Sequence, residues 1–167
     1  IHPFRDGNGR TGRILMILQL IQDELLTLPV LYISGYINKN RSEYYQCLLD
    51  VTTGNKWREF IIFMLHGFYE QAKHTRMSLG EITRLFHTLK ARVRTEHSKI
   101  YSAELIDALF TYPVITPTRL AAVLGKHYTT TSKYLIQLAE AGILFETTIG
   151  KYHLFVNQLL MDILKKE

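Results

Sequence analysis

Cysteine is almost absent from this sequence of 167 residues, with Cys47 as its single example. A lone thiol cannot form an internal disulfide, so the fold must be stabilised by a packed core. Long hydrophobic runs are also missing, because polar residues interrupt even the most apolar stretch, 14–28. No secretory pattern opens the chain. We therefore expect a cytoplasmic protein without a membrane-spanning segment.

Acidic residues are scarce in one part of the chain, and this part decides how the net charge of +5 is interpreted. Residues 73–99 contain seven Lys or Arg against two Glu, whereas from Ser102 onward six basic residues balance six acidic ones. A basic excess indicates nucleic-acid binding where it clusters on a binding element. We interpret the excess over 73–99 as the solvated face of a connecting helix.

The spacing of apolar residues predicts helices throughout the first hundred residues. They are expected over 14–26, 41–51, 56–73 and 78–95, with a turn over 34–40. The first of them is apolar on nearly every side, which predicts a central position in the fold.

Past Lys99 the pattern changes to short elements in the order of a winged helix-turn-helix domain. Ser102 and Thr116 are expected to cap two helices, and Gly125 and Gly142 to end the second and the third. The predicted elements are helices over 103–110, 117–124, 129–141 and 157–164, with a β-hairpin over 143–156 that turns at Gly150.

The predicted fold is therefore mainly α, with one domain over 1–99 and a winged helix-turn-helix domain with a small β-hairpin over 100–167. The chain starts with Ile1 rather than Met, and its most distinctive motif begins at the next residue without a supporting element ahead of it. We expect the chain to be a fragment of a longer protein.

That motif is a glycine-rich segment directly before the first predicted helix. It reads His2-Pro3-Phe4-Arg5-Asp6-Gly7-Asn8-Gly9-Arg10-Thr11-Gly12-Arg13. Gly7, Gly9 and Gly12 allow a tight turn and close approach of a ligand to the backbone, and the N–H groups that open the following helix have no helical acceptor. This combination predicts an anion site suited to phosphate.

Charged side chains in the same segment suit a nucleotide and its metal ion. Arg10 and Arg13 are three residues apart and project to the same side of a helix, where each guanidinium can hold phosphate oxygens. Asp6 is the only carboxylate of the segment. Because Mg²⁺ typically takes one or two carboxylates together with phosphate oxygens and water, Asp6 is the expected metal anchor.

His2 is the candidate general base, since a neutral imidazole can take a proton from an attacking hydroxyl. The segment has no Ser or Cys nucleophile, so direct in-line transfer fits it better than a covalent intermediate. A zinc site with His2 and Asp6 is a weaker alternative, because no further ligand is suitably spaced. Taken one at a time, the residues can be explained as a structural turn, a structural histidine and solvated arginines. Taken together, the same residues predict phosphate binding.

The segment closely resembles the defining motif of the Fic family: His, Pro, Phe, any residue, Asp or Glu, Gly, Asn, Gly or Lys, Arg, and a second Arg three residues later. Every position matches, and the resemblance extends through 33–37, 40–45 and Trp57 to about residue 71. A C-terminal winged helix is a common companion in one bacterial group of this family. The resemblance implies an enzyme that uses Mg²⁺ and moves AMP from ATP onto a Ser, Thr or Tyr hydroxyl of a target protein.

By this resemblance His2 would be the general base and Asp6 the Mg²⁺ ligand. The implied nucleotide-binding residues are Gly7, Asn8 and Gly9 at the inner phosphates, Arg10 and Arg13 at the outer ones, and Tyr44 and Tyr45 beside the base. For at least one tyrosine, packing in the helical core is an equally good interpretation. A kinase-like branch tends to carry Ala and Lys in place of Gly7 and Gly9, which favours AMP transfer, while transfer of UMP or phosphocholine stays open.

Two usual elements of the family have no counterpart in the sequence. Fic proteins normally have helices ahead of the motif and a β-hairpin flap that aligns the target peptide. Many also carry an inhibitory helix whose Glu pairs with the second motif Arg, here Arg13. Activity is therefore expected of the full-length parent, and an inhibitory helix would lie upstream of Ile1 or on another protein.

The winged helix supports a rival hypothesis, a DNA-binding regulatory protein with an accessory Fic part. The predicted recognition helix contributes only Lys133 and the wing only Lys151, fewer cations than DNA-reading modules usually present. The hydroxyls over 129–134 can still reach backbone phosphates. Protein docking or homodimer formation is the other role considered for this domain, and a non-catalytic interaction module is the third hypothesis.

Overall fold

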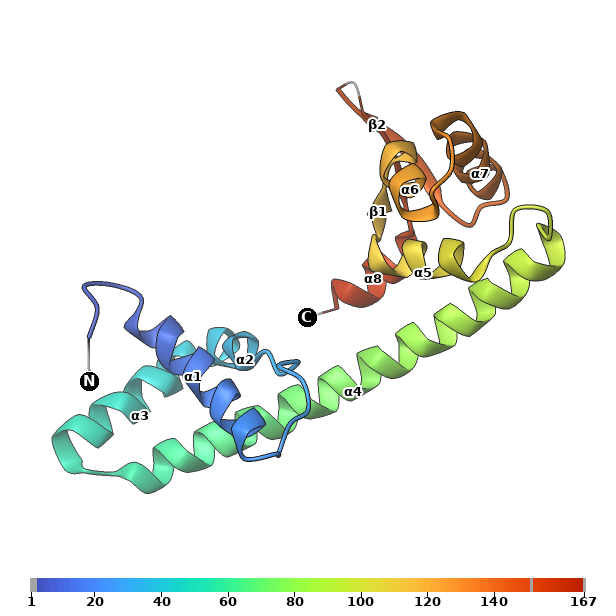
Figure 1. The fold of residues 1–167 in the computed structure, drawn as a ribbon. Coiled ribbons are helices and arrows are strands. Elements are labelled where there is room, and N and C mark those ends of the chain that lie inside the picture. Colours follow the sequence, from blue (N-terminus) through green and yellow to red (C-terminus); the bar gives the residue numbers. More distant parts are fainter. Residues whose placement is uncertain (1–2, 151, 167) are drawn as a thin grey trace. The chain divides into compact units, whose positions relative to one another are not determined.

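The computed structural model describes residues 3–150 and 152–166. The chain forms two compact units, Ile1–Met77 and Ser78–Glu167. Figure 1 shows helices α1 to α4 in the first part of the chain, and short helices with a small sheet after α4. The mainly α fold with a small antiparallel sheet is therefore confirmed. Within the described residues, no helix is both long enough and apolar enough to cross a membrane.

Four helices build the N-terminal unit. They are α1 (Asn8–Gln22), α2 (Ile33–Lys39), α3 (Arg41–Gly54) and the first part of α4 (Trp57–Glu96). Ile33 and Ile37 of α2 are buried against Phe63 and Met64 of α4, and partly buried side chains of α1 and α3 complete this cluster. Ile33 and Ile37 lie one helical turn apart, so both reach the same core.

Two predictions for this region are wrong. The expected turn over 34–40 is helix α2, because the burial of Ile33 and Ile37 outweighs the weak helix propensity of Ser34 and Gly35. The helices expected over 56–73 and 78–95 are one continuous helix, α4. No proline lies between them, and Gly80 alone does not break a helix that is packed on tertiary partners.

The predicted central position of the first helix is also wrong for the described structure. Of the apolar residues of α1 only Ile17 is buried, while Ile14, Leu15 and Leu18 are 61%, 59% and 52% exposed. The helix contacts the core cluster through one face, with Met16 beside α2 and α4. Apolar composition all round a helix allows burial on every side, but burial requires partners on every side.

The C-terminal unit follows the predicted order of short elements. It contains α5 (Ala103–Thr111), β1 (Val114–Ile115), α6 (Pro117–Leu124), α7 (Tyr128–Glu140), β2 (Phe145–Ile149), β3 (Tyr152–Val156) and α8 (Gln158–Leu164). The strands pair antiparallel in the order β1-β3-β2, so the hairpin is confirmed. Strand β1 was not predicted, because a strand of two residues is too short to show an alternation of apolar and polar side chains. Phe155 lies at the centre of the sheet opposite Ile115 and Glu146, and its side chain is fully buried.

The expected caps are present. Ser102 Oγ accepts a hydrogen bond from the Leu105 N–H at 3.1 Å, and Thr116 Oγ1 accepts one from the Arg119 N–H at 3.2 Å. Gly125 and Gly142 have φ values of 60° and 67°, the left-handed conformation that ends helices. Hydrogen bonds from its own backbone N–H and from Ser102 lower the pKa of the Glu104 carboxyl.

The two compact units divide at residues 77 and 78, within α4, rather than near residue 99. Leu89 and Val93, in the last turns of α4, are buried in the same cluster as Ile100 and Leu105. The C-terminal part of this helix therefore packs with the second unit, and the domain boundary near Lys99 stays a prediction.

Thr131 fixes the start of α7 to the start of α6. Its side chain is fully buried, and its hydroxyl lies 2.9 Å from the Pro117 carbonyl oxygen and 3.0 Å from that of Tyr128. A buried hydroxyl needs such acceptors, since an unpaired one would cost free energy. The link determines how the first turns of the two helices lie relative to each other.

Gly67 allows α2 and α4 to approach closely, and its replacement tests this packing. A Cβ at this position would lie 2.6 Å from Tyr36 Cδ1 and 2.9 Å from Ile33 Cδ1. We expect Gly67→Ala to lower the free energy of unfolding by about 1–3 kcal/mol through overpacking, in spite of the better helix propensity of alanine. Urea unfolding followed by the fluorescence of Trp57, the single tryptophan, reports on this unit.

Gly80→Ala in the same helix is the matched control. A Cβ there would meet only the Arg84 side chain, at 3.8 Å. Only the higher helix propensity of alanine then affects stability. We expect the free energy of unfolding to rise by up to about 1 kcal/mol, as measured by urea unfolding followed by far-UV circular dichroism. Equal effects of the two substitutions would contradict the close approach at Gly67.

Candidate functional site

The start of α1 is built around the backbone of Gly7. This residue has φ 83° and ψ 4°, a left-handed conformation that glycine adopts without strain. Its carbonyl oxygen accepts hydrogen bonds from the Thr11 N–H at 2.9 Å and the Thr11 hydroxyl at 3.1 Å. The turn places the first N–H groups of the helix, beginning at Asn8, at an end where helical geometry provides no acceptors for them. No acidic residue lies in this first turn.

Asn8 holds the loop that leads into the helix. Its Oδ1 accepts a hydrogen bond from the Phe4 N–H at 3.0 Å, and its Nδ2 donates one to the Phe4 carbonyl oxygen at 2.7 Å. The side-chain amide thus closes the loop on both sides of one residue. The predicted role of Asn8 beside phosphates can still be served by its backbone N–H.

Asp6 lies at the mouth of this loop and is solvated. Its Oδ1 accepts a hydrogen bond from the Gly7 N–H at 2.6 Å, and its Oδ2 lies 3.4 Å from Arg10 Nη2. The Asp6 and Arg10 side chains are 94% and 72% exposed, so this ion pair adds little stability. The carboxylate is held in place yet open to solvent, a setting that suits a cation bound mainly by non-protein oxygens.

A metal held at Asp6 would need ligands from elsewhere. Among the residues that the structure describes, no group of three or more His, Cys, Asp or Glu is arranged to hold an ion. Mg²⁺ keeps several waters and shares phosphate oxygens, so one carboxylate fits it. Zinc, which takes four protein or water ligands, fits less well. His2, the other ligand considered for zinc and the candidate base, lies outside the described residues.

Arg10 and Arg13 line the same cavity, of about 370 Å³. The two residues therefore lie on one side of the helix. The other walls are mostly apolar, with Ile17 and Leu18 of α1 and Tyr32 before α2 among them. Arg13 Nε is shielded from solvent and has no hydrogen-bond partner, so an unpaired cationic donor is buried beside the cavity.

The glycines of the segment differ in what surrounds them. A Cβ at Gly7 would lie 3.6 Å from Arg10 Nη2, and one at Gly9 would lie 3.4 Å from Arg13 Nη1. Both distances are ordinary van der Waals contacts, so the positive φ of Gly7 is what requires glycine there. At Gly12 nothing lies within 4 Å, so the local packing does not require glycine there.

Tyr44 and Tyr45 lie on α3, and neither lines the cavity of the two arginines. Tyr44 packs against the core cluster, with its ring centroid 6.0 Å from that of Phe63 and 6.3 Å from that of Phe60. Tyr45 is 65% exposed. The arrangement of Tyr44 is the one that core packing predicts, and Tyr45 remains the tyrosine with a ring open to a ligand.

The segment over 29–34 was not predicted to belong to the site. Pro29, Leu31, Tyr32 and Ser34 line the cavity opposite Arg10 and Arg13. The segment has no charged residue and no motif spacing, so no sequence signal connects it with the arginines.

Titratable groups deeper in the N-terminal unit do not offer a nucleophile. Burial raises the pKa of the Cys47 thiol, and the nearby carboxylates of Glu43, Asp50 and Glu59 raise it further. Burial, Glu43 and Glu70 raise the pKa of the Tyr36 hydroxyl in the same way. Both groups stay protonated at neutral pH.

Comparisons with known proteins match both ends of the chain. A family model described as "Fic/DOC family" matches residues 1–20, and one described as "Protein adenylyltransferase SoFic-like, C-terminal domain" matches residues 85–160. A protein of Aquifex aeolicus (strain VF5), described as "Probable protein adenylyltransferase", is 31% identical over 131 residues, which cover 75% of this chain and 35% of that protein.

The chain thus spans about a third of the length of this relative. The motif segment lies within one matched region, and most of the helices and strands of the C-terminal unit lie within the other. The two family models match separate parts of the chain, and the relative is described as a probable protein adenylyltransferase. These matches agree with the geometry at the start of α1. The chain belongs to the Fic family.

Proposed function

We propose that the full-length protein transfers AMP from ATP to a hydroxyl group of a target protein. The observation that supports this most is the cavity that Arg10 and Arg13 both line, with Arg10 also in contact with Asp6. Two guanidinium groups near the N-terminus of a helix are suited to a polyphosphate. The relative that is described as a protein adenylyltransferase points to the same chemistry.

In this proposal the chain contributes the nucleotide side of the reaction. The N–H groups at Gly7, Asn8 and Gly9 hold the inner phosphates, and Arg10 and Arg13 hold the outer ones. Asp6 holds Mg²⁺, which neutralises charge on the phosphates. Arg10 also contacts the Asp6 carboxylate, whereas the Nε of Arg13 has no hydrogen-bond partner.

The transfer itself needs no covalent enzyme intermediate. The oxygen of a Ser, Thr or Tyr hydroxyl attacks the α-phosphorus of ATP, the bond to the bridging oxygen breaks, and pyrophosphate leaves. His2 accepts the proton of the hydroxyl. The protonated Cys47 and Tyr36 have no part in this step. A cytoplasmic location suits a reaction that uses ATP.

Replacement of His2 tests the reaction. We expect the full-length protein to transfer radiolabelled AMP to itself or to a protein target with ATP and Mg²⁺, and His2→Ala to reduce the rate by roughly a hundredfold or more, since general-base catalysis contributes about 10²–10⁴. Label from [α-³²P]ATP, but not from [γ-³²P]ATP, must appear on protein. Equal labelling by the wild type and His2→Ala would show that His2 is not the base.

Nucleotide binding tests the two arginines separately from catalysis. We expect Arg13→Ala to weaken binding of Mg²⁺-ATP about 10- to 100-fold, because a hydrogen bond to a charged group contributes about 1.5–3 kcal/mol. Isothermal titration calorimetry on the full-length protein measures this. Arg5→Ala is the matched control, because Arg5 is exposed in the same loop but does not line the cavity. An equal loss in both variants would mean that general charge, not the cavity, binds ATP.

A further inference from the structure

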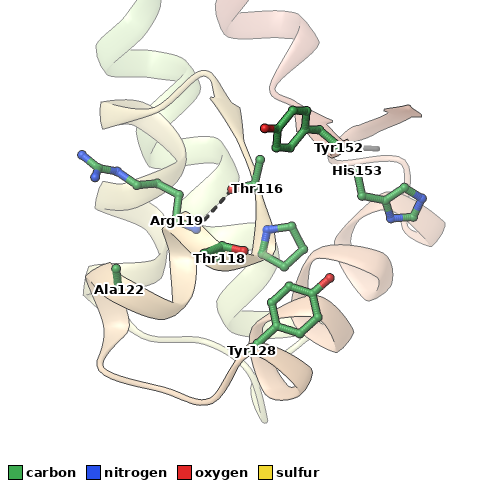
Figure 2. A pocket seen from close by; sticks show the side chains of 8 residues that line it. Thr116, Thr118, Arg119, Ala122, Tyr128, Tyr152 and His153 are labelled. Carbon is green, nitrogen blue, oxygen red and sulfur yellow. Dashed lines mark hydrogen bonds between the residues drawn. The ribbon is translucent and has the colours of Figure 1, made fainter. Parts of the chain in front are cut away.

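The C-terminal unit has a groove of its own, of about 460 Å³, that the proposed transfer does not use. Figure 2 shows that its walls come from three separate elements. The polar side chains that line it are Thr116, Thr118 and Arg119 from the start of α6, Tyr128 from the start of α7, and Tyr152 and His153 from β3. The groove therefore lies where the helix pair α6–α7 meets the hairpin.

The chemistry of the groove suits an anion. Four of its side chains carry hydroxyls and one carries a guanidinium, and none of the described residues that line it is acidic. Residues 108–139, which contain α6 and all of α7 except its last residue, Glu140, have no Asp or Glu. The same stretch contains Arg119, Lys126 and Lys133, all exposed. Three of the six Lys and Arg from Ser102 onward thus lie in a stretch without carboxylates.

Arg119 is held in place by Tyr112. Its guanidinium carbon lies 4.5 Å from the centroid of the Tyr112 ring, and its Nη2 donates a hydrogen bond to the Tyr112 hydroxyl at 2.7 Å. This contact uses one of the five guanidinium N–H donors, and Figure 2 shows the guanidinium directed away from Tyr128, Tyr152 and His153, at the edge of the groove. Thr116 and Thr118 stand beside it on the first turn of α6.

One carboxylate lies close by, on β2. Glu146 Oε1 is 3.1 Å from Nε2 of His153, which lines the groove. The carboxylate is therefore directed at the imidazole of the neighbouring strand rather than being one of the lining groups. The buried hydroxyl of Thr131 keeps the starts of α6 and α7, and with them both helical walls of the groove, in a constant relation.

From these contacts we infer that the groove holds the phosphate backbone of duplex DNA, with the exposed side chains of Thr129 and Lys133 on α7 turned toward the duplex. Hydroxyl groups, arginine and helix N-termini are the usual protein partners of DNA phosphates, and they set the register of a helix-turn-helix on the duplex. Pro117, Ala122 and the two tyrosine rings give the groove apolar area, but its polar groups are hydroxyls, one imidazole and one guanidinium, without a lining carboxylate, which favours an anion. This inference does not depend on the transfer of AMP.

Binding is measured by fluorescence anisotropy, with the whole chain and a labelled random-sequence duplex of about 20 base pairs, or two helical turns. We expect binding at about 50 mM NaCl, and a fall of log affinity with log salt concentration of slope about −3 if Arg119, Lys126 and Lys133 each neutralise one phosphate. No binding at this salt concentration would overturn the inference. So would equal affinity for a single strand or an RNA duplex, because the chain would then attract any polyanion.

Thr118→Glu is the decisive variant. It places a carboxylate in the groove but at the first turn of α6, where a negative charge stabilises a helix, so the fold should be kept or slightly stabilised. We expect at least about tenfold weaker DNA binding, because the added charge repels phosphate. Thr118→Gln is the neutral control of the same size and should bind within about twofold of the wild type. Unchanged DNA affinity of Thr118→Glu would overturn the inference.

A second pair of variants separates the exposed face of α7 from overall charge. We expect Lys133→Gln to weaken binding several-fold and to reduce the salt slope by about one, whereas Lys99→Gln, with the same change in net charge at an exposed position outside α6 and α7, should do neither. Equal effects of the two substitutions would show that net charge alone attracts DNA.

Discussion

The packing of α4 is the constraint on which the rest of the structure depends. A helix of 40 residues needs tertiary contacts to be stable in water, and α4 finds them at both ends. Phe63 and Met64 are buried in the core of the N-terminal unit, and Leu89 and Val93 in that of the C-terminal unit. Since both pairs belong to one helix, each core contributes to the stability of the helix that the other core uses.

The N-terminal core also determines where the candidate nucleotide site can form. Gly67 lets α2 come close to α4, and α2 begins at Ile33, within the segment over 29–34 that lines the cavity together with Arg10 and Arg13. The buried pair Ile33 and Ile37 thus places Tyr32 near the arginines of α1. The site is shaped by backbone turns and helix ends, and its charged groups remain close to solvent.

The starts of α1 and α6 are built in a similar way. At α1 a left-handed glycine exposes helix N–H groups beside two arginines, and at α6 a threonine cap starts a helix beside one. In both places a carbonyl receives a hydroxyl that holds the turn together: Gly7 from Thr11, and Pro117 from Thr131. In each arrangement the turn is fixed before any ligand binds. Side chains that are already fixed lose less conformational entropy on binding.

The helix ends and the spacing of the motif could be predicted from the sequence, because caps and glycine turns depend on only a few neighbouring residues. Ser102, Thr116, Gly125 and Gly142 ended or began helices as predicted, and Arg10 and Arg13 were expected on one side of α1. Only the tertiary structure decided that 34–40 is a helix, that α4 is unbroken and that α1 is largely exposed, since each depends on burial against distant residues. The cavity wall over 29–34 and the groove that joins α6, α7 and β3 were beyond the sequence for the same reason. They exist only where separate elements meet.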